Sequence, residues 1–452
     1  MGGSAGRLAP PNIYTFYTAN SSTRAAKMAA LAWGCGRLGG DVNQKSNLRF
    51  TSKTCYTTFA MIKRKLASCV LKAATQYPSV TLFGPRQSGK TTLARELFPG
   101  YAYANLEHLE TRRLATDDPE AFFRRFKPPV VIDEVQRVPE LTSQIQVMID
   151  ADRRSPGRFI LTGSHQPLLA EAVSQSLAGR TSLLTLYPPS LEELGEQGRG
   201  LSTDELIWRG FMPELHVTGI DPYDYYRNYF QTYVERDVRR IVNVKDVSLF
   251  ERFVRLLAGR VGQLVNNAGL AGEVGVSAMT IASWMSVLEA SFIVFRLQPF
   301  FTNRSKRLVK TPKVYFAEPG LAAYLLHLET PEHVAHDPLR GALFENLVVM
   351  ESVKSRTNAG REPSLHFLRT ESGFEIDLVS ERGRELDIAE IKSAMTFHDD
   401  FAKNLRAFRR DDARVRSASV VYDGTDYDLS DGVRVRNLRS MYPPLENDGD
   451  DA

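Results

Sequence analysis

Apolar and polar positions follow a repeating pattern in the segment that begins near residue 78. Short apolar runs rich in β-branched and aromatic residues alternate with segments, such as TTLARELF and LTSQIQVMIDADRR, whose apolar positions recur at helical spacing. Strands that alternate with helices are typical of a parallel sheet covered by helices, so we predict an α/β fold for this part. The runs expected to form strands are residues 79–84, 101–107, 128–134, 158–164 and 181–188.

The pattern becomes mainly helical between residue 190 and about residue 260. Residues 262–300 fit a helix-turn-helix, with a turn at Gly275, a helix cap at Ser277 and apolar positions at helical spacing after the cap. Two apolar strands, FIVFRLQPF and TPKVYFA, follow, and these elements together predict a winged-helix-like segment. From residue 340 to residue 425 the order is helix, strands, helix and strand, which predicts a second α/β domain.

Composition and charge exclude few functions. The 452 residues are 43% hydrophobic and 24% charged, which is ordinary for a globular protein. The formal net charge of +4 does not by itself indicate a nucleic-acid-binding protein. No apolar run approaches the roughly 18 residues of a membrane span. Cys35, Cys55 and Cys69 have no metal-binding or redox spacing, which favours a reducing compartment, the cytoplasm.

The first 60 residues differ from the rest of the chain. Asp41 is the only acidic residue between Met1 and Arg95, and residues 22–40 are basic and rich in small side chains. These features resemble an organelle transit peptide or a weak signal sequence, and a transit peptide would mean import into an organelle. The alternative is a disordered extension or a misplaced start, because a clear helical pattern begins only at Met61.

The octapeptide GPRQSGKT, residues 84–91, matches the phosphate-binding motif G-x-x-x-x-G-K-[ST] between an apolar strand and a helix. Backbone N–H groups of such a loop surround phosphate oxygens. Lys90 is then expected to reach the β- and γ-phosphates of ATP, and the hydroxyl of Thr91 to bind Mg²⁺. The alternative is a glycine-rich turn whose lysine has no such role. We expect ATP to contact Gly84, Pro85, Arg86, Gln87, Ser88, Gly89, Lys90, Thr91 and Thr92.

Acidic and polar residues end two further apolar runs. VVIDE closes with Asp133, which can hold the metal through water, and Glu134, which can orient or deprotonate the attacking water. LTGS places Thr162 and Ser164 at the end of the next strand, where a polar side chain can sense the γ-phosphate. Arg180, in LAGR, is a candidate sensor or an arginine finger that acts on a second copy of the chain. Its alternative is a solvated surface arginine.

Five stretches together resemble a large, mostly prokaryotic family of AAA-type ATPases, over about residues 61–425: GPRQSGKTTLA, VVIDEVQ, ILTGS, SLAGR and YVERDVRRI. The resemblance implies an extended AAA+ P-loop NTPase fold with ATP and Mg²⁺ and Glu134 as the catalytic residue. It also favours Arg180 as a sensor or, if it acts on a second copy, as the finger of a homo-oligomer. It gives no role to YVERDVRRI, whose opposite charges at helical spacing predict a helix surface or an interdomain set of salt bridges. One departure is Glu318 followed by Pro319, where similar proteins have an aspartate before a small residue.

The C-terminal domain of that family resembles the PD-(D/E)xK nuclease fold, and this chain contains the residues that such a metal centre needs. Glu345 lies on a predicted helix, Asp377 on a predicted strand, and Glu390 and Lys392 on one face of the next strand. Carboxylates in this pattern bind Mg²⁺, which activates water, and the lysine positions that water or screens the scissile phosphate. The alternative is a hairpin whose Glu–Lys pairs are solvated.

The middle segment offers one basic feature. No lysine or arginine stands between Arg260 and Arg296, so the second helix of the helix-turn-helix is a poor reader of DNA. The hairpin tip at 304–313 is basic and contacts either a nucleic-acid backbone or only solvent, and a winged helix used for protein contact is a further alternative. Its basic residues are Arg304, Lys306, Arg307, Lys310 and Lys313.

We therefore expect a protein that binds and hydrolyses ATP and couples its nucleotide state to a nuclease-like domain that acts on DNA. The alternative is a nucleotide-switched interaction or signalling protein whose nuclease-like domain is inactive. The expected segments are an extension at 1–60, the ATPase domain at 61–195, a helical linker or lid region at 196–260, a winged-helix-like segment at 261–318, the nuclease-like domain at 319–430 and an acidic tail at 431–452.

Overall fold

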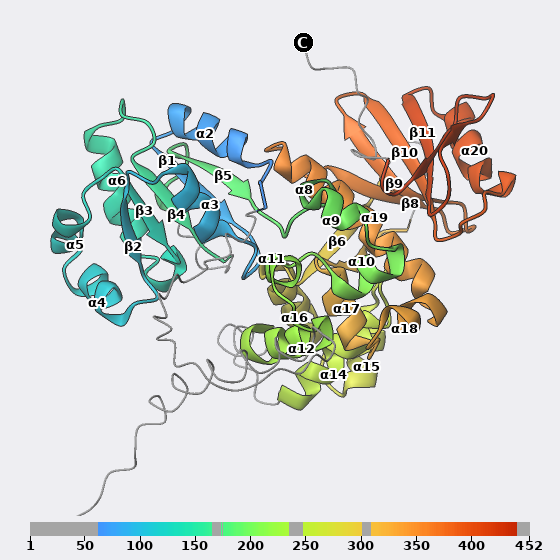
Figure 1. Cartoon of the computed structure of the whole chain (residues 1–452), viewed down its shortest axis with the longest axis horizontal. Coiled ribbons are helices and arrows are strands. Elements are labelled where there is room, and N and C mark those ends of the chain that lie inside the picture. The colour runs from blue at the N-terminus through green and yellow to red at the C-terminus, as the bar shows by residue number, and fades with distance from the viewer. Residues whose placement is uncertain (1–61, 165–172, 174, 235–246, 301–308, 441–452) are drawn as a thin grey trace, which may run out of the picture. The chain divides into compact units, whose positions relative to one another are not determined.

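The computed structural model describes residues 62–164, 173, 175–234, 247–300 and 309–440 (Figure 1). The first 61 residues, the stretch ERDVRRI and the hairpin-tip residues Arg304, Lys306 and Arg307 lie outside the described part. Among the described helices, no single one is long and apolar enough to cross a membrane. One bent pair, Asn267–Val274 with Ala278–Ala290, meets that test by length and composition.

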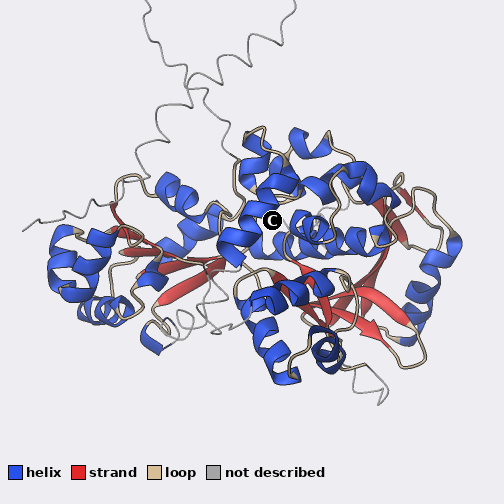
Figure 2. Cartoon of the chain, turned by 90° about the horizontal axis from the view of Figure 1, so that it is seen from below, coloured by secondary structure: helices blue, strands red, loops and turns tan. Residues whose placement is uncertain are grey.

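A five-stranded parallel sheet forms the N-terminal part of the described chain, as the sequence predicted. The strand order is β2 (Ala102–Asn105), β3 (Val130–Asp133), β4 (Phe159–Thr162), β1 (Ser79–Phe83) and β5 (Thr181–Thr185). Every residue of β1, β3 and β4 is buried, because helices cover both faces of the sheet (Figure 2). The helices of this part are α2 (Ala67–Gln76), α3 (Lys90–Leu97), α4 (Leu109–Asp117), α5 (Pro119–Arg125), the 3-10 turn η2 (Val135–Arg137) and α6 (Leu141–Ala151).

The parallel direction of these strands brings three motifs together. The phosphate loop follows β1, Asp133 ends β3 and Thr162 ends β4. Strand β1 pairs with β4 so that Leu82 lies opposite Thr162, one residue before the end of β1. The carboxyl ends of parallel strands share one edge of a sheet, and in open α/β sheets that edge is where ligands bind.

Short helices follow the first sheet. Two of them begin with capping boxes, in which a serine hydroxyl and a glutamate three residues later satisfy the first free N–H groups: Ser190 with Glu193, and Ser202 with Glu205. The elements are α8 (Leu191–Leu194), α9 (Glu196–Arg199), α10 (Thr203–Arg209), α11 (Pro213–Val217), α12 (Pro222–Tyr229), the π-helical turn η3 (Phe230–Val234), α14 (Val247–Ala258), α15 (Asn267–Val274) and α16 (Ala278–Ala290).

The turn and the cap expected between the two helices of the helix-turn-helix are present in α15 and α16. Gly275 takes a left-handed conformation (φ 88°), and the Ser277 hydroxyl accepts the backbone N–H of Thr280 at 3.1 Å. Only glycine adopts this conformation at little cost, which is why the break falls there. The assignment of a winged helix stays a prediction.

An eight-stranded mixed sheet forms the C-terminal part. Its strand order is β12 (Tyr427–Asp428), β13 (Arg434–Asn437), β11 (Val415–Tyr422), β10 (Glu385–Lys392), β9 (Glu375–Arg382), β8 (Leu365–Arg369), β6 (Val294–Pro299) and β7 (Lys313–Phe316). The hairpin expected as a wing is thus part of this sheet, because β6 pairs in parallel with β8 through Gln298 and His366. The sheet continues across residue 318, where the sequence placed a domain boundary.

Two helices cover this second sheet on opposite faces. Leu347 of the first helix belongs to the same buried cluster as Leu378 and Ile391, whereas Leu405 of the second belongs to a different cluster with Ile388. Alternate residues along the strands therefore face different helices. The helices of this part are α17 (Pro319–Leu325), α18 (Pro331–His336), the covering helix α19 (Arg340–Asn358), the 3-10 turn η4 (Asp399–Ala402) and the covering helix α20 (Lys403–Asp411).

Candidate functional site

The phosphate loop folds around the amine of Lys90. The Nζ atom donates hydrogen bonds to the carbonyl oxygens of Gly84 (3.0 Å) and Pro85 (2.6 Å), and only 5% of the residue is exposed. Gly84 (φ 149°) has no room for a side chain, since a Cβ atom there would lie 2.1 Å from the carbonyl oxygen of Leu186. Burial lowers the pKa of Lys90 to about 8, against the attraction of Glu134. The amine expected to reach phosphate is therefore already inside the loop.

Asp133 joins three elements at the edge of the sheet. Its carboxylate accepts hydrogen bonds from the hydroxyls of Thr91 (2.8 Å), Tyr103 (2.9 Å) and Thr162. Mg²⁺ that accompanies a nucleotide is usually held by one or two carboxylates together with water and phosphate oxygens. The hydroxyl of Thr91 and the carboxylate of Asp133 fit the metal that the phosphate-loop motif implies, because they lie in direct contact. Tyr103, from β2, was not identified from the sequence.

Glu134 follows directly after β3 in a left-handed conformation (φ 58°, ψ 45°), which is uncommon for a residue with a side chain and is often found at functional sites. Its N–H donates to the Thr162 hydroxyl (3.3 Å), and its carboxylate accepts from Nε2 of Gln136. The same Nε2 donates to the Ser164 hydroxyl (2.9 Å). Burial raises the pKa of Glu134, and Lys90 opposes the shift. Gln136 thus links two predicted residues, although sequence reasoning gave it no role.

Arg180 lies at the opposite edge of the sheet. Residue 181 pairs with Ser79, the first residue of β1, and the Ser79 N–H donates to the Arg180 carbonyl (3.1 Å). The phosphate loop begins at the other end of β1, about 16 Å away at about 3.3 Å per residue. The guanidinium instead forms two hydrogen bonds with the Asp150 carboxylate, at 2.9 Å and 2.8 Å. The guanidinium of Arg180 therefore does not reach the phosphate loop of its own chain in this structure.

An apolar pocket of about 370 Å³ lies beside the phosphate loop and the start of α3. Arg64 ties the first described residues to this loop, because its guanidinium donates to the carbonyl oxygens of Ser88 (2.8 Å) and Tyr187 (2.6 Å). Such a pocket next to a phosphate site has the chemistry to take a nucleobase. Sequence reasoning identified neither Arg64 nor the pocket. Its lining includes Ile62, Gly89, Leu93, Pro189, Pro213 and Val217.

The four residues predicted for a nuclease centre come together in the C-terminal part. Lys392 Nζ lies 2.7 Å from Glu390 Oε1 and 3.5 Å from Asp377 Oδ2. Lys313 Nζ lies 2.9 Å from Glu345 Oε1 and 3.9 Å from Asp377 Oδ1, so that Glu345 of α19 meets the strand residues through this lysine. Burial, followed by repulsion from Asp377, raises the pKa of Glu390 to about 7.

Three residues that were not predicted for this centre complete it: Lys313, Tyr315 and Glu375. Lys313 Nζ lies 2.7 Å from Glu375 Oε1, and the Tyr315 hydroxyl donates to Glu345 Oε1 at 2.5 Å. The assignment of Lys313 to a basic hairpin tip is wrong, because the residue begins β7 and is only 3% exposed. The carboxylates of Glu375 and Asp377 on β9 and of Glu345 on α19 draw its ammonium inward. We call these three residues, with Glu345, Asp377, Glu390 and Lys392, the C-terminal centre.

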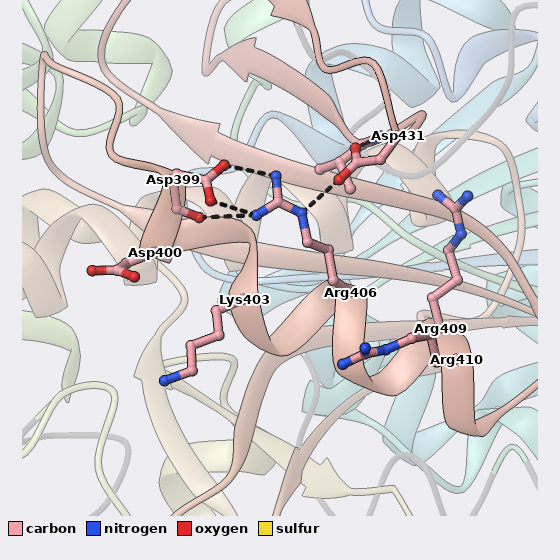
Figure 3. Close-up of a pocket in the computed structure, with 8 residues that line it drawn as sticks. Asp399, Asp400, Lys403, Arg406, Arg409, Arg410 and Asp431 are labelled. Carbon is pink, nitrogen blue, oxygen red and sulfur yellow. Dashed lines mark hydrogen bonds and ion pairs between the residues drawn. The ribbon is translucent and has the colours of Figure 1, made fainter.

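A pocket of about 450 Å³ on α20 carries further charges. Figure 3 shows the guanidinium of Arg406 between Asp399 and Asp431, at 2.7 Å and 2.5 Å from their carboxylate oxygens. Lys403, Arg409 and Arg410 line the same pocket and form no ion pair with any residue in the described part of the chain. Three cations are therefore available to an anionic partner here, with the charge of Arg406 already neutralised.

Contacts connect the phosphate loop to the middle helices. Gln87 of the loop is left-handed (φ 61°), and its side-chain oxygen accepts a hydrogen bond from the Tyr225 hydroxyl of α12 (2.5 Å). The next residue, Tyr226, donates to Glu318 Oε1 (3.0 Å), which also accepts the N–H of Phe211 (2.7 Å). Burial raises the pKa of Glu318, the acid at which this sequence departs from similar proteins. Here it fixes α12 to the start of α17.

Helix α19 holds the segment that leaves the first sheet after β5. Glu351 Oε2 accepts the N–H of Leu191 (2.8 Å), and Lys354 Nζ donates to the carbonyl oxygen of Pro189 (3.1 Å) and to Glu351 Oε1 (2.9 Å). The Lys354 ammonium also lies 3.7 Å from the centre of the Phe211 ring. Because α19 carries Glu345 as well, one helix contacts both the exit of the first sheet and the C-terminal centre.

Three family matches cover most of the described chain in order. Residues 76–195 match the AAA domain, residues 201–332 match a domain of unknown function (DUF8612), and residues 340–441 match another domain of unknown function (DUF4143). Together with the five-stranded parallel sheet, the first match identifies a P-loop NTPase fold. The third match assigns no activity, so a nuclease-like fold for the C-terminal part stays a proposal.

Three bacterial relatives match most of this chain. Uncharacterized protein Rv2008c of Mycobacterium tuberculosis and uncharacterized protein Mb2031c of Mycobacterium bovis are each 30% identical over 396 residues, which are 86% of this chain and 86% of either relative. An uncharacterized protein of Haemophilus influenzae is 22% identical over 325 residues, with 66% of this chain and 74% of that protein covered.

Two solved structures illustrate the more distant similarities. The Walker-type ATPase PABY2304 of Pyrococcus abyssi is 16% identical with a TM-score of 0.37, and the match covers 59% of this chain and 96% of that one. AMPPCP-bound DnaA of Aquifex aeolicus is 14% identical with a TM-score of 0.25, and the match covers 50% of this chain and 85% of that one.

Proposed function

We propose that this chain, which belongs to the same family as the mycobacterial proteins Rv2008c and Mb2031c, is an AAA-type ATPase that passes its nucleotide state to its C-terminal sheet. The observation that carries the proposal is the assembly of one site from Lys90, Thr91, Asp133 and Glu134 at the carboxyl edge of the first sheet. These are the parts that phosphoryl transfer to water requires: a cation for the phosphates, ligands for Mg²⁺ and a base for the attacking water.

Each residue of the site has a distinct task. Lys90 exchanges its two carbonyl partners for the β- and γ-phosphates, while N–H groups of the loop bind the remaining phosphate oxygens. Thr91 and Asp133 would hold Mg²⁺, which would supply positive charge against the charge that develops on the phosphate oxygens. Glu134 orients the attacking water and takes its proton, because burial gives its carboxylate a higher proton affinity than an exposed glutamate has. Gln136 holds that carboxylate in place.

Arg180 completes the site of a neighbouring copy. Its position at the amino edge of the sheet keeps it from its own phosphate loop, and the ion pair with Asp150 fixes its direction. An arginine finger supplied by a neighbour stabilises charge on the γ-phosphate in the transition state. We therefore propose that the active form is a homo-oligomer in which each copy completes the site of the next.

The nucleotide state reaches the C-terminal sheet through two sets of contacts. Gln87 of the phosphate loop accepts the Tyr225 hydroxyl, and the neighbouring Tyr226 bonds to the buried Glu318. Glu351 and Lys354 of α19 hold the segment after β5. When the phosphate loop rearranges on binding phosphates, the hydrogen bond between Gln87 and Tyr225 changes. Helix α19 then transmits this conformational change to the C-terminal centre. Such a relay requires that each nucleotide state favour a different arrangement of these contacts.

Phosphate release from ATP tests the proposal directly. We expect Lys90→Ala to weaken ATP binding by roughly 10- to 100-fold, since it removes charged hydrogen bonds of about 1.5–3 kcal/mol. Turnover at subsaturating ATP should fall at least as much. The matched control is Lys72→Ala on the exposed side of α2, which should change neither quantity. Undiminished Mg²⁺-dependent turnover in Lys90→Ala protein would contradict the assignment of the site.

The relay makes a separate prediction at Tyr225. Changing Tyr225→Phe removes a neutral hydrogen bond to Gln87, so ATP affinity should change by less than about tenfold. The ATP-dependent change in hydrogen–deuterium exchange of α19 should fall by about half or more. Tyr223→Phe on the same helix is the control, because Tyr223 packs against the Tyr324 ring. If ATP changes the exchange of α19 in Tyr225→Phe protein as much as in the wild type, the hydrogen bond between Tyr225 and Gln87 has no part in the relay.

A second candidate function is metal-dependent cleavage of nucleic acid by the C-terminal part. The pattern of Glu345, Asp377, Glu390 and Lys392 and the three available cations of the α20 pocket favour it, whereas the Lys313 ammonium among these carboxylates counts against a bound metal. The test is cleavage of DNA and RNA with Mg²⁺ or Mn²⁺ by wild-type and Lys392→Ala protein. Cleavage by the wild type that is lost in Lys392→Ala protein would establish a nuclease. Equal cleavage by both proteins would exclude the C-terminal centre as the site of cleavage. A wild-type protein that hydrolyses ATP and cleaves nothing supports the nucleotide-switched interaction protein.

A further inference from the structure

We propose that Lys313 is the resident cation of the C-terminal centre and takes the position among its carboxylates that a divalent metal would need. This role of Lys313 does not depend on ATP hydrolysis. With the ammonium in place, Glu345, Asp377 and Glu390 do not form the Mg²⁺ site that the sequence predicted for them.

The geometry places the Lys313 ammonium where a metal ligand set would converge. Its Nζ atom lies 2.7 Å from Glu375 Oε1, 2.9 Å from Glu345 Oε1 and 3.9 Å from Asp377 Oδ1. Mg²⁺ requires oxygens at about 2.1 Å and Ca²⁺ at about 2.3–2.6 Å, so a metal at the ammonium position would need all three oxygens to move inward, that of Asp377 by more than about 1 Å. An ammonium and a metal ion cannot occupy the same space. Within the described residues, no group of three or more Asp, Glu, His or Cys is arranged to hold a metal.

Lys313 is held in this position by the fold. It is the first residue of β7, lies 5.5 Å from the centre of the Phe367 ring and is 3% exposed. Burial lowers its pKa, but Glu345, Asp377 and Glu375 outweigh burial and hold the pKa above its ordinary value. Charged groups this deeply buried are stable only when paired. The lysine is therefore a charged part of the core rather than a surface cation that has folded inward.

Other hydrogen-bond donors and cations occupy most of the carboxylate oxygens that a metal would bind. The Tyr315 hydroxyl and the Lys313 amine both donate to Glu345 Oε1, and Arg369 lies 3.4 Å from the second oxygen of Glu375. Lys392 bridges the carboxylates of Glu390 and Asp377. Glu390 Oε2 is buried with no hydrogen-bond partner among the described residues.

The proposal predicts that removal of one ammonium creates a metal site. In Lys313→Met, the carboxylates of Glu345, Glu375 and Asp377 would face one another without their cation, and a divalent ion would relieve their repulsion. Lys313→Arg keeps the positive charge and should create no site. Lys310→Met is the matched control, because Lys310 is an exposed lysine of the same segment.

Calorimetric titration of the full-length, nucleotide-free protein with MnCl₂ tests this. We expect wild type, Lys313→Arg and Lys310→Met to lack a saturable Mn²⁺ site at the centre. Lys313→Met protein should bind one Mn²⁺ at least about tenfold more tightly than the wild type does. The double variant Lys313→Met with Asp377→Asn should lose this gain in affinity. Circular dichroism of each variant verifies that it is folded.

Two results would overturn the proposal. The first is Mn²⁺ binding by the wild type that Asp377→Asn weakens by about tenfold or more, because the metal would then bind beside Lys313. The second is a folded Lys313→Met protein that gains no Mn²⁺ affinity. If Lys313→Met does not fold, the comparison of wild type with Asp377→Asn decides. Asp377-dependent Mn²⁺ binding overturns the proposal, and its absence supports it.

Discussion

Replacement of Glu134 by glutamine is expected to lower the ATP turnover number by about 10²–10⁴-fold, the usual contribution of a positioned general base. The amide cannot accept the proton of the attacking water, but it keeps the shape of the side chain and its oxygen can still accept a hydrogen bond from Gln136. ATP affinity should therefore change little, because Lys90 and the loop N–H groups are intact. Single-turnover phosphate release and equilibrium binding of a labelled ATP separate the two quantities.

The matched control for this prediction is Glu140→Gln, which changes the same side chain at the residue preceding α6. It should leave turnover within about twofold of wild type, since surface substitutions away from a site have small effects. Glu134→Gln protein that hydrolyses ATP at the wild-type rate would show that another group activates the water. In that case Gln136 and Ser164, which share the same hydrogen-bond group, would be the next residues to change.

Replacement of Arg180 by alanine is expected to lower turnover by about 10³-fold or more while ATP binding is retained. The reason is that a finger contributes to the transition state and not to the resting complex. Arg153→Ala is a close control, since Arg153 also donates a hydrogen bond to Asp150 but is 67% exposed in its side chain. If Arg180→Ala loses turnover and Arg153→Ala does not, the loss is due to the Arg180 guanidinium and not to a disturbed Asp150.

A mixing experiment shows whether Arg180 acts on a second copy. Glu134→Gln and Arg180→Ala proteins are each expected to be nearly inactive alone. In a mixed oligomer, an Arg180→Ala copy with intact Glu134 can lie next to a Glu134→Gln copy with intact Arg180, and that site is complete. Activity should therefore reappear on mixing. Persistent inactivity in mixed oligomers, whose formation is verified by size, would contradict the action of Arg180 between copies.

The ATP site was the most predictable part of the structure, because its motif is local. Residues 84–91 carry the loop glycines, Lys90 and Thr91 in one continuous stretch, and the ends of β3 and β4 follow from the alternation of strands and helices. Residues that reach the site from elsewhere were missed. Arg64 and Tyr225 contact the loop from 24 and 138 residues away, and no periodicity along the chain indicates such pairings.

The C-terminal centre shows the same limit more sharply. Glu390 and Lys392 were predicted on one face because residues two apart in a strand share a face, and that spacing is local. Lys313 was missed because β6 and β7 were assigned to a wing, whereas β6 pairs with β8 across a long stretch of sequence. A lysine in a basic run is usually solvated. Only the fold reveals that three carboxylates surround this one.

The central claim, that the nucleotide state reaches the C-terminal sheet, is tested most directly by hydrogen–deuterium exchange. Full-length Glu134→Gln protein, which should bind ATP without turnover, is compared with and without ATP and Mg²⁺. We predict altered exchange in the phosphate loop and also in α19 and β10, which carry Glu345, Glu390 and Lys392. Exchange that changes only within residues 62–190, with α19 and β10 unaffected, would contradict the relay.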